Sequence, residues 1–507
     1  MPTRDHTLHR QPTQQPLDLS QLPSLTVAVE QADVAITTQP SFDLVVIGGG
    51  ITGAGIAREA ARRRWRTLLL EQRDFAGGTS NLSSKMIHGG LRYLAQGQWQ
   101  LTQQAAQARE ALRQRWPDLI CDMPYLYPYR NRWQQLQLVV GLWLYHWLAK
   151  ASEQHRPQQF DRRQLQRLLP LALPQSLGAN RYFDALCDDA ALVLRTLQEA
   201  VSHGALLKHY CAVSAIEQQP SRCQLTLANG GQISTKVVVN ATGVWGDQLT
   251  SLPQQQRLRP QRGSHLLLPH QALPINCALT LHHPHDNRVV FAYPWLGCTV
   301  LGTTDLEHLQ DKTQPCRISA AEQRYLLALL PHLGLPKPTT IIASWSGLRP
   351  IICDDAEQAP SAASREHLVW QQQRLISVSG GKLTTFAQMA NDTLTRASQF
   401  LPKLKPQTDT PLQATIDSNP QYLFNTQVST QQLTFWCQHG AVVHLSDLLV
   451  RRTRLGWLLG ADLKQHQAQI QRLCQPLLPW DDQQWQQQWQ DYWQEFTQQY
   501  AAHPIEL

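Results

Sequence analysis

The sequence predicts an α/β protein of several domains, with parallel strands in its first part and helices at its C-terminal end. Its 507 residues, 42% of them hydrophobic, are more than one ordinary core can use. An apolar run at residues 43–47 leads through glycines into a helical pattern at 51–64 and a second apolar run at 67–70. This alternation is typical of a strand–helix–strand unit with parallel strands.

Further strand candidates divide the rest of the chain. Residues 237–240 and 375–378 are short apolar runs that end in glycine-containing turns, and short strands and helices alternate between them. Residues 1–40 are rich in Gln, Pro and Thr and predict a flexible tail. We therefore expect two interleaved domains over residues 41–400, the second with a mixed sheet, and a C-terminal helical cap domain over 401–507.

An aromatic stripe marks the end of the cap. It recurs at helical spacing behind two acidic residues suited to cap a helix start, and consists of Trp485, Trp489, Trp493, Phe496 and Tyr500 behind Asp481 and Asp482. Such a stripe packs against the body of a protein or forms a partner or membrane surface. We adopt the packing interpretation.

Charge and cysteine content indicate which partners, metal sites and disulfides to expect. Lys and Arg number 45 against 38 Asp and Glu, and the net charge of +7 suits an anionic substrate or an anionic membrane surface. A slightly basic soluble protein has the same balance, and we expect no nucleic-acid partner. The ten cysteines lie far apart with no C-x-x-C motif, so we expect neither a metal site nor a disulfide framework.

No secretory signal is recognisable in the first residues, which lack a positively charged start and an apolar core. The longest apolar run, residues 136–149, is shorter than the ~20 residues that span a bilayer. We therefore expect a cytoplasmic protein without a transmembrane anchor.

A glycine-rich turn carries the first functional signal. Gly48, Gly50 and Gly53 form a G-x-G-x-x-G pattern between the first predicted strand and helix. In a Rossmann-like domain these glycines allow a tight turn, close approach of a pyrophosphate and close packing of helix on strand. Glu71 ends the next strand, where a carboxylate accepts hydrogen bonds from a ribose and disfavours NADP. The pattern predicts dinucleotide binding and leaves NAD or FAD open.

Motifs along the chain decide between these cofactors. They are TSNLSSKMIHGGLRYL at 79–94, DDA at 188–190, NATG at 240–243, GSH at 263–265, GTTD at 302–305, GLRP at 347–350, GGKLTT at 380–385 and RRTRLG at 451–456. In this order they resemble the aerobic, FAD-dependent glycerol-3-phosphate dehydrogenases from residue 42 to about 400, with a match in the helical cap. The resemblance implies FAD as cofactor and oxidation of sn-glycerol 3-phosphate to dihydroxyacetone phosphate, with a hydride passing to flavin N5 and electrons passing to a membrane quinone.

The same motifs supply candidate site residues. Oxidation of a secondary alcohol needs a base, for which we select His265 and hold His88 in reserve as a residue that contacts the flavin. Arg349 is the second catalytic candidate, because a guanidinium stabilises a developing alkoxide. A phosphate dianion needs several fixed donors, and the candidates that bind it are Arg92, Tyr93, Arg349, Arg365 and Lys382. Cofactor contacts are predicted at Ser84, Lys85, Gly243, Gly381, Leu383 and Thr384.

Three departures and two alternatives remain. Ser379, Phe386 and Ala387 replace residues that the family commonly shows, and they bear on local packing or phosphate affinity. An oxidase that uses O₂, including one of the amino-acid oxidase group, has the same cofactor signature. A flavin-containing sensor without turnover is the alternative from another class, and the retained candidate residues argue against it.

Residues 130–150 combine aromatic, apolar and basic side chains. The apolar members are Trp133, Leu136, Leu138, Val139, Leu142, Trp143 and Trp147, and Arg130, Arg132 and Lys150 flank them. Such a segment binds a membrane surface or packs in a core. We expect peripheral attachment to the cytoplasmic membrane face, and a homodimer is possible.

Overall fold

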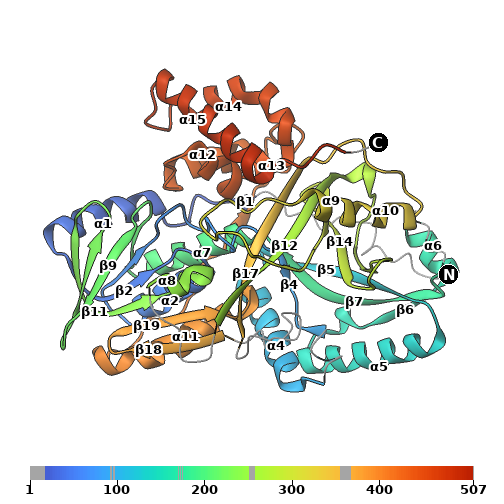
Figure 1. Cartoon of the computed structure of the whole chain (residues 1–507), viewed down its shortest axis with the longest axis horizontal. Helices are drawn as coiled ribbons and strands as arrows, with labels where there is room; N and C mark the ends of the chain where they lie inside the picture. The colour runs from blue at the N-terminus through green and yellow to red at the C-terminus, as the bar shows by residue number, and fades with distance from the viewer. Residues whose placement is uncertain are drawn as a thin grey trace.

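The computed structural model describes residues 17–91, 94, 97–169, 171, 173, 175–249, 257–353 and 367–505. Figure 1 shows two halves, each built on a sheet, with the C-terminal helices gathered along one side. A continuous buried apolar cluster reaches from Leu44 in the first sheet through Tyr293 in the second to Trp457 in the C-terminal helices. The predicted α/β fold class is confirmed.

The first sheet has eight strands among the described residues. Its main order is β18-β19-β11-β2-β3-β8, and β10 and β9 continue from β11. The strands are β2 (Ser41–Ile47), β3 (Thr67–Leu70), β8 (Leu206–Lys208), β9 (Val213–Gln218), β10 (Cys223–Leu227), β11 (Gln232–Asn240), β18 (His367–Gln372) and β19 (Leu375–Gly380). Strands β19, β11, β2, β3 and β8 are parallel.

The register of the parallel strands aligns their carboxyl ends. Ile47 of β2 pairs with Asn240 of β11 and with Leu70 of β3, and Asn240 pairs with Ser377 of β19. The four predicted strands therefore lie side by side, because each is a short, fully buried apolar run of the kind that parallel sheets use. The turns that follow them meet at one edge, where open α/β sheets bind their ligands.

The second sheet is almost entirely antiparallel. Its main order is β16-β12-β15-β14-β13-β5-β7-β4, with β17 on β12 and β6 on β7. The strands are β4 (Met86–Ile87), β5 (Ile120–Tyr129), β6 (Gln158–Asp161), β7 (Gly178–Cys187), β12 (Arg257–Pro269), β13 (Ala278–His282), β14 (Val289–Trp295), β15 (Cys298–Gly302), β16 (Leu306–Glu307) and β17 (Ala343–Cys353). Because β4, β5 and β7 come from the first half of the chain, the two domains interleave.

Helices cover both sheets. Those of the two sheet domains are α2 (Ile51–Arg62), α4 (Trp99–Arg115), α5 (Arg132–Ala149), α6 (Arg162–Leu168), α7 (Asp189–Ser202), α8 (Gly246–Leu249), α9 (Ala320–Leu327), α10 (Leu329–His332) and α11 (Phe386–Ala397). Helix α5 runs along the lower edge of Figure 1, next to β7. The predicted helix at 51–64 ends two residues early, and Arg64 adopts a positive φ of 65°.

The N-terminal segment differs from the predicted flexible tail. Residues 1–16 lie outside the described residues, but helix α1 (Leu25–Thr38) is ordered and is capped by the Ser24 side chain. Leu25, Ala28 and Ala32 are buried on one face of α1. Strand β1 (Leu17–Asp18) pairs with β20 (Thr415–Ile416). The flexible-tail prediction is wrong for residues 17–38, because small apolar residues at helical spacing escape a reading based on Gln and Pro content.

The C-terminal region is helical, as predicted. It contains α12 (Thr430–His439), a π-helical turn at Asp447–Arg452, α13 (Leu455–Leu459), α14 (Gln467–Cys474) and α15 (Asp482–Glu495). Asp481 caps α15 in a capping box with Gln484. Trp485, Trp489 and Tyr500 are buried against the body of the protein. The packing interpretation of the aromatic stripe is confirmed, whereas the domain boundary at residue 400 stays a prediction.

Candidate active site

A cavity of about 1780 Å³ lies at the carboxyl edge of the parallel strands. One wall comes from the turns after β2, β11 and β19 and from the segment around Ser80–Ser84, and helix α5 contributes to the opposite side. The lining includes most of the predicted cofactor and substrate residues, namely Gly48, Gly50, Glu71, Ser84, Gly243, Arg349, Gly381, Lys382, Leu383 and Thr384. Distant motifs of the sequence therefore meet around one space.

The glycine turn has the geometry that its pattern predicts. Gly48 has a φ of +117°, and a Cβ there would meet the Ala241 carbonyl oxygen at 2.5 Å. A Cβ on Gly53 would lie 1.9 Å from the Gly48 carbonyl oxygen, so only glycine lets α2 approach β2 this closely. Gly53 does not line the cavity; its part is to allow this packing.

The N-terminus of α2 suits an anion. Gly50 is its N-cap and supplies no side-chain acceptor, and the first turn holds no acidic residue. The helix dipole and the N–H groups of this turn thus lack a negative partner from their own helix. The Ile51 N–H donates to Ser80 Oγ at 3.0 Å, which anchors the segment that faces the turn.

Glu71 lies beside the glycine turn rather than in open solvent. Its Oε2 accepts from the Gly49 N–H at 2.6 Å and its Oε1 from the Arg73 N–H at 2.8 Å. Burial raises the pKa of the Glu71 carboxyl, and these two N–H donors oppose the shift. The carboxylate also lines the cavity, the position predicted for contact with a ribose.

One further turn, at Gly243, leaves room for a flat ring. Gly243 has a φ of +64°, and a Cβ there would meet no atom within 4 Å. Ser379 Oγ donates to the Gly243 carbonyl at 2.9 Å and holds this turn, so the departure at Ser379 has a local role. Phe386 packs on Gly55 of α2, where a Cβ would lie 2.6 Å from its ring. Neither departure obstructs the cavity.

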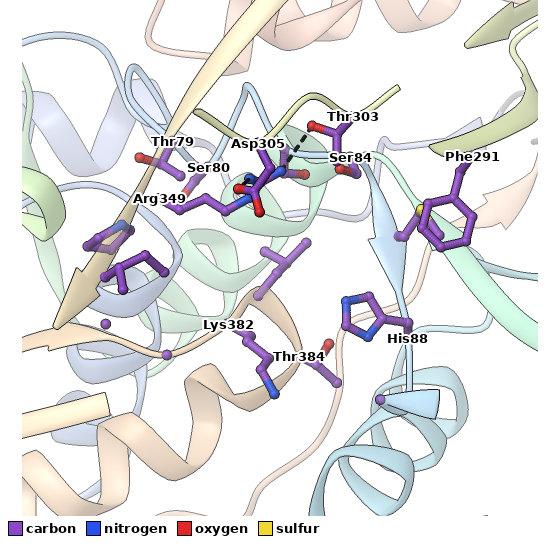
Figure 2. A pocket seen from close by; sticks show the side chains of 18 of the residues that line it. Thr79, Ser80, Ser84, His88, Phe291, Thr303, Asp305, Arg349, Lys382 and Thr384 are labelled. Carbon is purple, nitrogen blue, oxygen red and sulfur yellow. Dashed lines mark hydrogen bonds and ion pairs between the residues drawn. The ribbon is translucent and has the colours of Figure 1, made fainter. Parts of the chain in front are cut away.

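Three polar side chains from different elements surround one part of the cavity (Figure 2). Arg349 comes from β17, Lys382 from the turn after β19, and His88 from the segment that follows β4. Arg349 donates from Nη1 to Asp305 Oδ1 and from Nη2 to Thr303 Oγ1, each at 3.0 Å. A Cβ on Gly263 would lie 2.3 Å from Arg349 Nη2, so this glycine makes space for the guanidinium.

His265 occupies a different position from the one predicted. It is buried in β12, stacks on Trp345 with 5.1 Å between ring centroids, and is absent from the cavity lining. Its Nε2 lies 2.9 Å from Ser84 Oγ, and Ser84 separates it from the cavity. Burial, followed by the charges of Arg349 and Lys85, lowers the pKa of His265 well below its ordinary value, so the ring is neutral at pH 7.

Lys85 lies behind the cavity wall. The side chain is fully buried, and Nζ donates to Asp189 Oδ1 at 2.8 Å and to the Asn81 carbonyl at 3.1 Å. The rings of Trp295, Trp345 and Trp457 lie about it at 4.8–5.1 Å. The side chain does not line the cavity, and the cofactor contact predicted for Lys85 stays a prediction. Burial by distant aromatic residues cannot be read from the SSK motif.

Three candidates, Arg92, Tyr93 and Arg365, lie outside the described residues. Sequence reasoning missed Asp305, which pairs with Arg349, and Tyr293, whose hydroxyl donates to the Ser84 carbonyl at 2.6 Å. The GTTD motif contains Asp305, and its place in that motif was the available signal. Tyr293 carried none, because β14 reads as an ordinary strand.

One buried cluster outside the cavity has the composition of a cation site. Asp74, His209 and Asp447 offer ligand atoms within 4.8 Å of one another. However, Arg452 donates to both Asp74 oxygens, and Arg451 donates to Asp74 and Asp447. Because guanidinium groups already compensate both carboxylates, we assign the cluster to contact between the helical cap and the first sheet.

Comparison with known proteins decides the family. The model of the "FAD dependent oxidoreductase" family matches residues 43–383. The chain belongs to this family. FAD is therefore its cofactor, as predicted, and the turns around Gly50 and Gly243 fit such a group. The family match ends before α12, which begins at Thr430 in the C-terminal helical region.

Relatives of this FAD-dependent oxidoreductase carry more specific names. It is 34% identical over 377 residues to "Glycerol-3-phosphate dehydrogenase 2" of Mycobacterium tuberculosis, a match that covers 71% of this chain and 64% of that protein. It is 32% identical over 370 residues to "Aerobic glycerol-3-phosphate dehydrogenase" of Bacillus subtilis, covering 70% and 66%. The predicted resemblance is confirmed, and the match spans just under two thirds of each relative.

Solved structures extend the likeness to the fold of the whole chain. The glycerol-3-phosphate dehydrogenase of Bacillus halodurans, complexed with FAD, aligns with a TM-score of 0.74 at 22% identity and covers 95% of this chain and 99% of its own. The L-α-glycerophosphate oxidase of Mycoplasma pneumoniae, with FAD bound, aligns with a TM-score of 0.60 at 16% identity, covering 74% and 98%. At these identities the likeness supports the fold alone.

Proposed function

We propose that this FAD-dependent oxidoreductase oxidises sn-glycerol 3-phosphate to dihydroxyacetone phosphate. The observation that carries the proposal is the meeting of Arg349, Lys382 and His88 around one part of the cavity, beside the glycine turns that suit FAD. Two cations serve a phosphate dianion and a histidine serves a hydroxyl, which together match a phosphorylated alcohol. The names of the mycobacterial and Bacillus relatives point to the same substrate.

Arg349 and Lys382 form the described part of the anion clamp. Asp305 and Thr303 hold the Arg349 guanidinium in one orientation, so its plane is fixed before a ligand arrives. A pre-oriented guanidinium loses less entropy when it grips two phosphate oxygens. Arg92, Tyr93 and Arg365 stay predicted members of the same clamp.

We assign the base to His88, because His265 lies behind Ser84. Among the described residues, His265 Nδ1 is buried without a hydrogen-bond partner. A buried N–H without an acceptor costs more than a lone pair without a donor, so the proton belongs on Nε2, where it donates to Ser84 Oγ. The Ser84 hydroxyl is then oriented by His265 and presents its own proton to the cavity. His265 is thus a positioning residue, and His88 takes the substrate hydroxyl proton.

The reaction removes two electrons and two protons in all from the alcohol. When bound, FAD accepts the hydride that leaves the substrate carbon. His88 receives the hydroxyl proton, and Arg349 stabilises the negative charge that develops on that oxygen. The other donors of the clamp remain on the phosphate, which is unchanged in the product.

For the electron acceptor we propose a membrane quinone. Helix α5 lines the outer side of the cavity with Leu136, Leu138 and Val140, so an apolar path leads from the site toward the surface. The same helix exposes Trp133, Trp143 and Trp147. No helix in the described ranges is long and apolar enough to cross a bilayer. We therefore propose peripheral attachment through α5 to an anionic membrane face, the cytoplasmic one, aided by Arg130, Arg132 and Lys150. A homodimer stays a prediction for sedimentation analysis.

Anaerobic addition of sn-glycerol 3-phosphate to the purified, FAD-loaded protein tests the proposal. We expect the flavin absorbance near its long-wavelength maximum to bleach, and a quinone analogue to restore it. Peroxide formed in air at the same rate would favour an oxidase. A flavin that stays oxidised with sn-glycerol 3-phosphate would remove the substrate assignment.

A further inference from the structure

One carboxylate beneath the cavity wall binds an unusual number of donors. Asp189, at the start of α7, accepts from the Ser83 N–H at 3.0 Å and the Ser83 hydroxyl at 2.7 Å through Oδ2. Its Oδ1 accepts from Lys85 Nζ at 2.8 Å. Ser83 and Ser84 line the cavity, whereas Asp189 is fully buried behind them. The carboxylate therefore fixes the segment from its buried side.

A residue of the helical cap completes this arrangement. Arg454 donates from Nη2 to Asp189 Oδ1 at 2.7 Å, and from Nε and Nη2 to the two oxygens of Asp188 at 2.7 and 2.5 Å. Nη1 donates to Asn81 Oδ1 as well. Arg454 is buried and lies 71 residues beyond residue 383, where the family match ends. The cap thus reaches the segment at two points, Asn81 directly and Ser83 through Asp189.

The charges in this network balance. Asp188 and Asp189 supply two negative charges, and Lys85 and Arg454 supply two positive ones, all of them buried. Burial acts to lower the pKa of Arg454, but the two carboxylates outweigh it and raise the value. Removal of one cation leaves a buried carboxylate short of a partner, which drives local rearrangement. Ser83 is bonded to this carboxylate, so a shift of Asp189 would displace the segment that bears Ser83 and Ser84.

The backbone conformation and the side-chain contacts of Arg454 also indicate a specific role. Arg454 has a φ of +64° in the left-handed region, which a non-glycine residue adopts only when its surroundings demand it. Its guanidinium carbon lies 4.9 Å from the ring of Trp457, and Trp457 also faces Lys85. A guanidinium that binds three side chains at once uses the fork that lysine lacks.

We propose that Arg454 is a positioning residue of the active site, which holds the segment Asn81–Lys85 through Asp189 so that Ser83 and Ser84 face the cavity. The helical cap is on this account part of the site. The expected loss of turnover rests on the proposed function, whereas the expected change at the cofactor does not.

Arg454→Lys is the decisive variant, because it keeps the charge and removes the fork. Arg472→Lys, on the exposed face of α14, is its matched control. We expect Arg454→Lys to lower kcat per bound FAD by about 10-fold to 100-fold, since a displaced positioning group costs rates of that order. KM should change less, because Arg349 and Lys382 are untouched. The visible spectrum of bound FAD should shift and its dissociation constant should rise.

A double-mutant cycle separates positioning from general stability. Ser83→Ala removes the hydroxyl half of the same link at its other end, leaves the Ser83 N–H on Asp189, and removes no buried charge. If Arg454 acts through Asp189 on Ser83, the double variant Ser83→Ala/Arg454→Lys should be hardly slower than the worse single variant. A purely structural role predicts a lower Tm in Arg454→Lys with normal kcat per FAD and a normal spectrum, and that result overturns the proposal. The proposal is also overturned if the losses of kcat in the two single variants multiply in the double variant.

The positioning role can be tested even if Arg454→Lys does not fold or if the substrate does not reduce the wild-type flavin. If Arg454→Lys does not fold, Ser83→Ala alone must still lower kcat per FAD and shift the flavin spectrum, and a wild-type result there overturns the proposal. If sn-glycerol 3-phosphate fails to reduce the wild-type flavin, the proposed function fails. The spectra and FAD dissociation constants of Arg454→Lys, Ser83→Ala and Arg472→Lys then decide the positioning role by themselves.

Discussion

The two walls of the cavity are built in different ways. The wall that carries the glycine turns and Ser80–Ser84 is held by short backbone contacts and by buried ion pairs such as Lys85–Asp189. The wall formed by α5 is a single amphipathic helix whose apolar side chains Trp133, Leu136 and Val140 are exposed. A rigid polar wall suits a cofactor and a charged substrate, whereas an apolar wall open to the surface suits an apolar electron acceptor.

This contrast predicts that substitutions in the first wall change the chemistry and substitutions in the second change delivery of the acceptor. Tyr145 of α5 packs closely against the residue after His88, since its hydroxyl would lie 2.2 Å from a Cβ on Gly89. The Tyr145 hydroxyl also donates to Asp184 Oδ1 at 2.6 Å.

The largest effect is expected at Gly50, because a protein without bound FAD carries out no flavin reduction at all. Gly50→Val adds a side chain to the N-cap of α2, where we expect the pyrophosphate of FAD to approach and where a Cβ would lie 3.1 Å from Ser80 Oγ. We expect FAD affinity to fall by a factor of roughly 10² or more, as the charge-assisted contacts to phosphate are lost. Gly141→Ala on α5 is the control, because a Cβ there meets nothing within 4 Å. Recovery of fully loaded Gly50→Val would contradict the account of the first wall.

The next largest effects are expected at His88 and His265, whose substitution should lower kcat by different factors. His88→Asn should lower kcat by a factor of roughly 10² to 10⁴, as expected for loss of a general base. His265→Asn should cost less, because it acts through Ser84. Stopped-flow reduction of the flavin measures both. The reverse order would return the role of base to His265.

Stability against pH offers an independent check on His265. Its pKa is depressed in the folded protein, so the unfolded chain binds a proton below about pH 6.5 that the native ring does not. The contribution of His265 is therefore complete above that pH and is lost as the pH falls below it. Thermal unfolding should show this loss in the wild type and a shallower one in His265→Asn. Equal slopes would mean that the ring is not held neutral.

Arg349→Ala should lower kcat/KM for sn-glycerol 3-phosphate by a factor of ~10², since contacts to the phosphate or the developing alkoxide are lost. FAD content should stay normal. Asp305→Asn, which only loosens the guanidinium, should fall between the wild type and Arg349→Ala. Near-wild-type kinetics for Arg349→Ala would assign this residue to packing.

The smallest effect on chemistry is expected in α5. Trp147→Ala removes an exposed indole and should weaken binding to anionic vesicles by about tenfold, because burial of this much apolar surface contributes that order of free energy. Activity with a soluble acceptor should not change. The exposed Leu309, in a loop apart from α5, supplies the control Leu309→Ala. Unchanged vesicle binding in Trp147→Ala would leave α5 without its proposed role.

The sequence predicted the parts of the site that local patterns determine. The strand–glycine–helix unit from β2 to β3 and the Ser-Gly-Gly and Ala-Thr-Gly turns depend on neighbours within a few residues, so their positions followed from the motifs. The choice between His88 and His265 did not follow from the motifs, since both lie near glycines. His265 stacks on Trp345, and this packing keeps it out of the cavity lining.

Burial by residues that are distant in the chain could not be predicted from the sequence for the same reason. Lys85 reads as a polar residue in a cofactor motif, but three tryptophans from distant segments enclose it. Arg454 and Asp189 are 265 residues apart in the chain. Helix α1 was missed because its buried face is made largely of alanine, which gives a weak periodic signal.

The most direct test of the central claim compares flavin reduction by sn-glycerol 3-phosphate with reduction by free glycerol. Both offer the same secondary alcohol, but glycerol lacks the dianion that Arg349 and Lys382 are proposed to bind. Two charge-assisted contacts of roughly 1.5–3 kcal/mol each predict a preference on the order of 10² or more in kcat/KM for the phosphate ester. Equal efficiency with glycerol would contradict the account, even with FAD bound and the fold intact.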